Sequence, residues 1–387
     1  SMVVGSIEEA VRKLVYASDK LKDPSVRRIR DKSGIYYFEE RPVEGGKVAF
    51  LFPGEGSQYA GMLSDLCIAF PEVRSVFDLV DRAFGKRKRD YLPSHTVFPL
   101  PLGQDSGAER LWKMDAAAES VFTASQALIK LMELLKIKPD AMLGHSTGEY
   151  SALLASRTID LKGDDGFVDF VLGVNAVYEE LAKAGRIKEG ALLTVGALDR
   201  EKLASVVDLS NGRVFVAMEN CPNQAVLCGE EEDIAAAESA LKGTGAISLR
   251  LPFARAYHTP LFSEVSDALR KHFDTVSVKP SEVAVYSCVT ASVYPSDHEG
   301  IRDLATIQWA SKVRFSDTVE AMYSSGVRTF IEVGPRGNLT AFVDDILRKK
   351  PHLALASNLH RKSGLSQINE LVALLYANHV PFDPCAL

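Results

Sequence analysis

Apolar residues along the chain recur in two kinds of pattern. Short, almost continuous apolar runs end at Phe52 and Gly144 and fill residues 283–287 and 328–333, as is typical of buried strands. Helical spacing of apolar positions is found at residues 61–70, 72–84, 116–135, 166–184, 338–348 and 366–377. Strands that alternate with helices in this way predict an α/β fold with a largely parallel sheet.

Residues 190–251 have a different pattern. Strand-like runs cover 191–195, 214–218, 224–228 and 247–251, and helical patterns cover 200–207 and 231–241. This order, βαββαβ, predicts a small ferredoxin-like subdomain inserted into the larger α/β unit.

These patterns divide the chain of 387 residues into four parts. Residues 1–46, which contain a charged amphipathic helix within 7–31, are expected to be an N-terminal linker. Residues 47–189 together with 252–350 are expected to form the large domain, and 351–387 a C-terminal linker.

Composition narrows the class of protein. The net charge of −6 argues against broad electrostatic binding to nucleic acid, and the basic runs 27–30 and 86–89 predict a solvated surface or a docking patch for an acidic partner. The five cysteines have no metal-ligand or CxxC spacing, which fits a reducing cytoplasm. We find no apolar run of membrane-spanning length and no signal peptide, so no membrane partner is expected. No metal or redox cofactor is expected either.

The clearest candidate for chemistry is Ser146, which lies between Gly144 and Gly148 at the junction of a strand and a helix. Such a sharp turn crowds any side chain at the flanking positions and exposes the serine hydroxyl at a helix N-terminus. A serine needs an adjacent base to act as a nucleophile. Alternatively, the motif is a glycine-rich turn with an ordinary serine cap.

Two loops could complete such a site. Residues 53–58 follow a strand and are glycine-rich, but they lack the lysine and the spacing of a phosphate-binding loop. A loop whose backbone N–H groups point at an oxyanion fits better. His258 lies between a strand and a helix, where it is either a catalytic base or a surface histidine.

Four motifs together resemble the malonyl-CoA:acyl-carrier-protein transacylase family, which includes the acyltransferase domains of polyketide and fatty acid synthases. They lie at residues 52–58, 144–149, 256–259 and 332–335, in the family's order. The first motif and the region of Leu92 are most similar to iterative polyketide synthases of the enediyne and polyunsaturated-fatty-acid kind, which would place the chain in antibiotic or lipid biosynthesis.

The resemblance implies roles for particular residues. Ser146 would take the acyl group from coenzyme A, and His258 would act as base, first on Ser146 and then on the phosphopantetheine thiol of an acyl carrier protein. The backbone carbonyl of Gln308 would orient His258. The backbone N–H groups of Glu55 and Thr147 would form the oxyanion hole.

The chain departs from the family in the acyl pocket. Malonyl-selective members carry an arginine where this chain has Val174 or Asn175, so the usual clamp for the malonyl carboxylate is missing. Arg255 is either a substitute or a solvated loop residue, and the bulk of Tyr257 argues against a branched acyl group. Neutral donors, Asn175, Tyr178 and Asn220, are the other candidates for holding the carboxylate, although Asn220 could instead be a turn residue.

The sequence therefore predicts transfer of an acyl group, malonyl in the first instance, from CoA to a carrier protein by a ping-pong mechanism. Neighbouring ketosynthase and other synthase domains are the further expected partners. Relaxed selectivity toward acetyl or longer acyl groups, a serine esterase of the α/β-hydrolase type, and an idle docking module are the alternatives.

Overall fold

The computed structural model describes residues 1–387 except 32, 41–42, 44, 86–90, 100–109, 198–199 and 387. The basic run 86–89, predicted as surface or docking patch, lies outside the described residues. No helix in the described part of the chain combines the length and apolar character needed to cross a bilayer.

A six-stranded sheet forms the centre of the large domain, with the strand order β10-β9-β4-β3-β11-β12. Five of its strands are parallel and β10 pairs antiparallel with β9. The strands are β3 (Lys47–Phe52), β4 (Ala141–Gly144), β9 (Ala284–Ser287), β10 (Ser292–Val293), β11 (Val327–Glu332) and β12 (Leu353–Ala356).

The continuous apolar runs are explained by burial of both faces of this sheet. Phe50 and Phe52 of β3 belong to one hydrophobic cluster, and Ala49 and Leu51 belong to another on the opposite face. Side chains of a strand alternate between faces, so one run of residues supplies both cores. The predicted α/β fold with a parallel sheet is confirmed.

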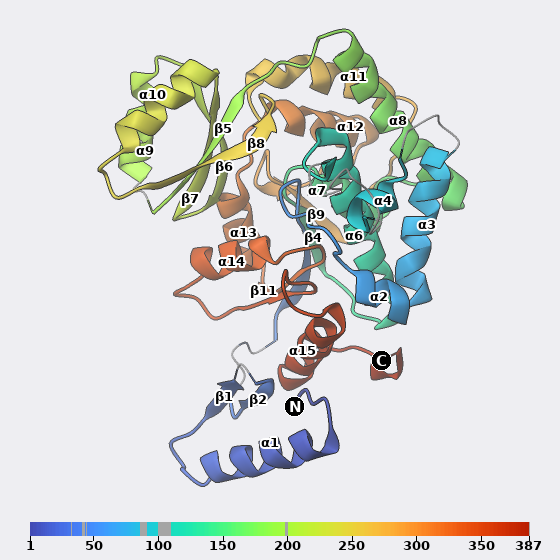
Figure 1. The fold of residues 1–387 in the computed structure, drawn as a ribbon, viewed down its shortest axis with the longest axis vertical. Coiled ribbons are helices and arrows are strands. Elements are labelled where there is room, and N and C mark those ends of the chain that lie inside the picture. The colour runs from blue at the N-terminus through green and yellow to red at the C-terminus, as the bar shows by residue number, and fades with distance from the viewer. Residues whose placement is uncertain are drawn as a thin grey trace.

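Helices cover both faces of the sheet (Figure 1). In the described residues of the large domain they are α2 (Ser64–Ala69), α3 (Pro71–Gly85), α4 (Pro93–Val97), α6 (Met114–Leu134), α7 (Gly148–Ala155), α8 (Gly163–Lys183), α11 (Ser263–Phe273), α12 (His298–Ile307), α13 (Phe315–Ser324), α14 (Asn338–Ile346) and α15 (Gly364–Ala377). Short 3₁₀ turns lie at Pro260–Phe262, Gln308–Ala310 and Pro384–Ala386.

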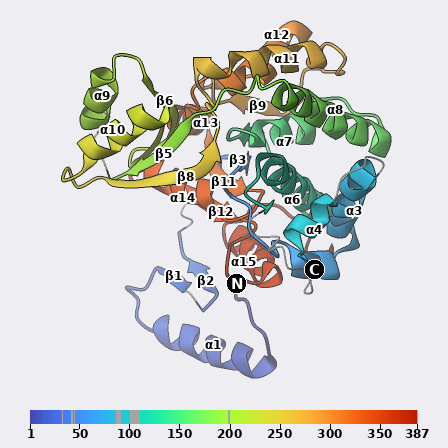
Figure 2. The same ribbon diagram turned by 45° about the horizontal axis from the view of Figure 1, so that its top comes forward.

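The inserted subdomain is a four-stranded antiparallel sheet with the order β6-β7-β5-β8. Two helices lie on one face and enclose a small core of their own, beside the large domain (Figure 2). The elements are β5 (Ala191–Gly196), α9 (Arg200–Leu209), β6 (Val214–Cys221), β7 (Gln224–Gly229), α10 (Glu231–Leu241) and β8 (Ile247–Ala254). The βαββαβ order is as predicted.

The N-terminal segment lies at one end of the molecule, beside α15 (Figure 1), and Ser1 Oγ donates to the carbonyl of Ala373 in α15 at 2.6 Å. It consists of α1 (Ile7–Lys20) and a hairpin of β1 (Arg28–Asp31) and β2 (Ile35–Phe38). The helix expected within 7–31 therefore ends at Lys20, and most of the basic run 27–30 belongs to the strand β1.

The C-terminal residues differ from the expected linker. Residues 353–356 form β12, which pairs with β11 at the edge of the main sheet, and all four are buried. Four alternating leucine and alanine residues are too short a run to predict a strand, but pairing with β11 and burial on both faces stabilise one. Helix α15 follows and is largely buried.

Candidate active site

The turn between β4 and α7 holds Ser146 in a left-handed backbone conformation, with φ of 54°. A Cβ atom at Gly148 would lie 2.1 Å from the carbonyl oxygen of Phe52, and one at Gly144 would lie 2.2 Å from the backbone of Glu149. Real Cβ atoms do not approach other atoms so closely. The two glycines are therefore required by the close approach of α7 to the strands, and Ser146 takes the strained position between them.

The structure brings together Ser146 and His258, which the inserted subdomain separates in the sequence. Ser146 Oγ and His258 Nε2 lie 2.7 Å apart, and His258 Nδ1 lies 2.9 Å from the carbonyl oxygen of Gln308. Because a carbonyl only accepts, Nδ1 donates to Gln308 and Nε2 is left to accept the hydroxyl proton of Ser146. The contact to Gln308 is made by the main chain, as the resemblance implies.

The His258 imidazole is held neutral by its surroundings. Its exposed fraction is 2%, and burial lowers the pKa of His258 to about 4, although the carbonyl of Gln308 acts in the opposite direction. The indole ring of Trp309 lies parallel to the imidazole, with 6.5 Å between ring centroids, and its Nε1 donates to the hydroxyl of Tyr150 at 2.8 Å. A neutral imidazole is the form that accepts a proton.

Glu55 and Thr147, the two residues expected to supply oxyanion donors, lie next to each other. The backbone N–H of Glu55 donates to Thr147 Oγ1 at 3.0 Å, and Thr147 directly precedes α7. The pKa of Tyr257 is raised well above its ordinary value by burial first and by Glu55 second.

A cavity of about 310 Å³ opens beside the Ser146 turn. Its wall is mostly aromatic and aliphatic and includes Phe122, Phe170, Val171, Val174, Tyr178, Ile187, Tyr257 and Trp309. The polar and charged side chains of the wall are Glu55, Glu119, Thr147, Asn175, Glu179 and Arg255, together with the tyrosines. The structure thus gathers four of the five predicted substrate-binding residues, Asn175, Tyr178, Arg255 and Tyr257, at one cavity.

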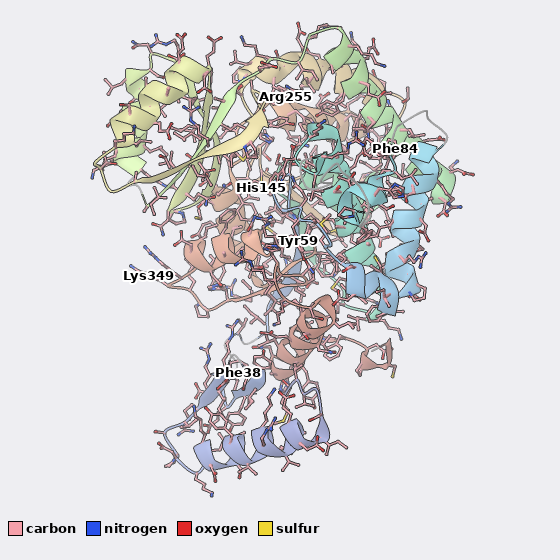
Figure 3. All side chains as sticks on the ribbon, in the orientation of Figure 1. Phe38, Tyr59, Phe84, His145, Arg255 and Lys349 are labelled. Carbon is pink, nitrogen blue, oxygen red and sulfur yellow. The ribbon has the colours of Figure 1, made fainter. Side chains whose placement is uncertain are left out.

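Asn220 is not among the residues that line this cavity. Its Oδ1 accepts a hydrogen bond from His145 Nε2 at 2.7 Å, and its Nδ2 donates to Gln224 at 2.9 Å. Asn220 therefore links the small subdomain to the residue before the nucleophile. His145 and Arg255 both lie in the region where the small subdomain meets the large domain (Figure 3).

Arg255 lines the cavity and also contacts residues that are not part of the cavity wall. Its Nη1 donates to the carbonyl of Ala254 at 3.0 Å and lies 3.8 Å from a carboxylate oxygen of Glu189. The Arg255 side chain is 27% exposed. A guanidinium in this position remains partly hydrated.

Three buried polar residues of the site could not be assigned from the sequence. Glu119 lines the cavity and accepts a hydrogen bond from Asn175. The ring of Trp309 lies parallel to that of His258. Glu149 is buried in the first turn of α7, directly after Gly148. Glu149 accepts hydrogen bonds from Ser287 and Tyr294.

Known proteins resemble this chain at the level of sequence and of structure. The family model for the acyl transferase domain matches residues 49–380. The malonyl CoA-acyl carrier protein transacylase of Bacillus subtilis is 30% identical over 314 residues, which are 80% of this chain and 93% of that protein. The polyketide synthase GfsA of Streptomyces halstedii is 28% identical over 87% of this chain, which spans only 4% of that protein.

Solved structures of acyltransferases also resemble this chain. The acyltransferase domain from the second module of the salinomycin polyketide synthase matches with a TM-score of 0.80 and 26% identity, over 100% of this chain and 84% of that one. A malonyl transacylase solved with a type II polyketide synthase acyl carrier protein matches with a TM-score of 0.71 and 28% identity, over 84% and 99% of the two chains. This chain belongs to the acyl transferase domain family, and it is an acyltransferase.

Proposed function

We propose that the chain transfers an acyl group from coenzyme A to the phosphopantetheine thiol of an acyl carrier protein by a ping-pong mechanism. The observation that carries this proposal is the contact of 2.7 Å between Ser146 Oγ and the neutral, buried His258. The named functions of the relatives, transacylases and a polyketide synthase, support the donor and the acceptor. An iterative synthase of the enediyne or polyunsaturated-fatty-acid kind is the proposed setting, with a ketosynthase among the neighbouring domains.

In the first half-reaction Ser146 Oγ attacks the thioester carbonyl carbon while its proton passes to His258 Nε2. The oxyanion that forms is stabilised by the backbone N–H groups of Glu55 and Thr147, and Glu55 exchanges its hydrogen bond to Thr147 Oγ1 for one to the oxyanion. The carbon–sulfur bond then breaks and the CoA sulfur takes the proton from His258. In the second half-reaction the carrier thiol gives its proton to His258 and its sulfur attacks the ester carbonyl carbon. The bond from that carbon to Ser146 Oγ then breaks, and Oγ takes the proton back from His258.

Malonyl is the acyl group we propose, bound by neutral donors. In the described residues the buried hydroxyl of Tyr178 has no hydrogen-bond partner, and an unsatisfied buried hydroxyl is costly. A malonyl carboxylate in the cavity would accept from this hydroxyl, with Asn175 near by. Neutral donors bind a carboxylate about half as strongly as charged ones, so we expect weak discrimination against acetyl.

The test is a kinetic assay with malonyl-CoA and a phosphopantetheinylated carrier protein as the second substrate. We expect parallel lines in double-reciprocal plots and transfer that is much faster than hydrolysis. In His258→Ala, loss of the general base should slow acylation by about 10²- to 10⁴-fold. Hydrolysis faster than transfer would favour the serine esterase, and an unchanged rate in His258→Ala would show that another base acts.

A further inference from the structure

We infer that Glu119 determines the acyl selectivity of this protein by placing a carboxylate in the wall of the acyl cavity. This inference rests on the proposed acyl transfer and deepens it. The expected weak discrimination between malonyl and uncharged acyl groups then has two causes: the presence of Glu119, and the absence of the arginine that malonyl-selective relatives carry.

The position of Glu119 is fixed by two helices. Glu119 lies on α6 and is 6% exposed, and its Oε1 accepts a hydrogen bond of 2.8 Å from Asn175 Nδ2 on α8. Both residues line the cavity. The acid is therefore anchored in the wall of the proposed acyl cavity, in contact with the segment of α8 where malonyl-selective relatives carry arginine.

The charges of the cavity wall reduce the preference for malonyl over an uncharged acyl group. Of the described side chains that line it, Glu55, Glu119 and Glu179 are acidic and Arg255 is the one that is basic. Like charges repel each other more strongly where one of them is buried, as Glu119 is, because less water screens them. A malonyl carboxylate meets this repulsion, whereas an acetyl group does not.

The Asn175–Glu119 hydrogen bond has a second consequence. An arginine at position 175 would lie within hydrogen-bonding distance of Glu119 and would form an ion pair with it. Restoring the family's arginine alone would then neutralise Glu119 instead of binding malonyl. The arginine becomes available to the substrate only when the acid is removed.

The experiment compares kcat/KM for malonyl-CoA and acetyl-CoA in the wild type, Glu119→Gln, Asn175→Arg and the double variant. Glutamine keeps an oxygen that accepts from Asn175, so the helices stay connected and thermal unfolding should be unchanged. We expect the malonyl/acetyl ratio to rise about tenfold in Glu119→Gln, which corresponds to about 1.4 kcal/mol. The ratio should change less than about threefold in Asn175→Arg, and it should rise about 10- to 100-fold further in the double variant.

Glu180→Gln is the matched control, because Glu180 lies on α8 next to the cavity wall but is exposed to solvent. It removes the same charge, and its ratio should equal that of the wild type. An unchanged or lower ratio in Glu119→Gln would overturn the inference, as would a full rise in Asn175→Arg alone. Failure of the wild type to load from either thioester would instead overturn the proposed function.

Discussion

The lowered pKa of His258 predicts that acylation of Ser146 continues well into the acidic range. Burial is the main cause of the pKa of about 4, compared with an ordinary value of 6.5. At pH 5.5 a histidine with a pKa of 4 is about 97% neutral, whereas one with a pKa of 6.5 is about 9% neutral. The single-turnover acylation rate at pH 5.5 should therefore be nearly equal to that at pH 7.5, and an unshifted histidine would show a drop of about tenfold.

The fold must survive at pH 5.5 for this comparison to hold. Because the pKa of His258 is lowered in the folded chain, the unfolded chain takes up the proton first, and stability falls by about 1 kcal/mol from pH 6.5 to 5.5. Burial raises the pKa values of Glu149 and Glu332 to about 7, so both acids stabilise the folded state below that pH and lose this effect as the pH rises through about 7. The two effects oppose each other, so the fold should persist.

The assay is rapid-quench measurement of acyl-enzyme from pH 5 to 8, with circular dichroism at each pH as the control for folding. A plateau from pH 8 down to at least pH 5.5 is the expected result. A rate that falls tenfold between pH 7.5 and 5.5 in a folded protein would refute the argument that burial holds His258 neutral.

Three further substitutions test individual contacts. Glu55→Gln should change kcat/KM by less than about threefold, because the main-chain N–H proposed for the oxyanion is unaltered, and a loss of activity would reveal a role for the carboxylate. Gln308→Ala should keep near-normal acylation, because His258 is oriented by the main-chain carbonyl, so a large loss would contradict that assignment. Gly148→Ala should abolish activity and lower Tm, because its Cβ would lie 2.1 Å from the Phe52 carbonyl, and a normal Tm would show that the turn can relax.

The residues that could be predicted from sequence are those whose local chain geometry restricts the amino acid. Glycine is the only residue type that fits the turn at positions 144 and 148, so the spacing of Gly144 and Gly148 marks Ser146 as a candidate, although an ordinary serine cap fits the same spacing. The four motifs in order then located His258, and the structure placed it against Ser146. The apolar runs predicted the large sheet and the βαββαβ pattern predicted the small one, because burial restricts the residue types that a strand can contain.

The features of the structure that the sequence did not predict depend on contacts between segments that are far apart in the chain. Asn220 was a candidate donor for the carboxylate, but its partner His145 comes from the other unit of the chain, and Asn220 is not among the residues that line the cavity. Glu119 looks like an ordinary helix residue until α8 brings Asn175 within 2.8 Å of it. The strand β12 is stabilised by its pairing with β11, which four residues of sequence cannot show.

The central claim is that Ser146 carries the acyl group. The most direct measurement is intact mass spectrometry after incubation with malonyl-CoA or acetyl-CoA, followed by peptide mapping, in the wild type and in Ser146→Ala. We expect one acyl group per chain on the peptide that contains Ser146, and none in Ser146→Ala. An acyl group mapped to another residue, or equal loading of Ser146→Ala, would contradict the account.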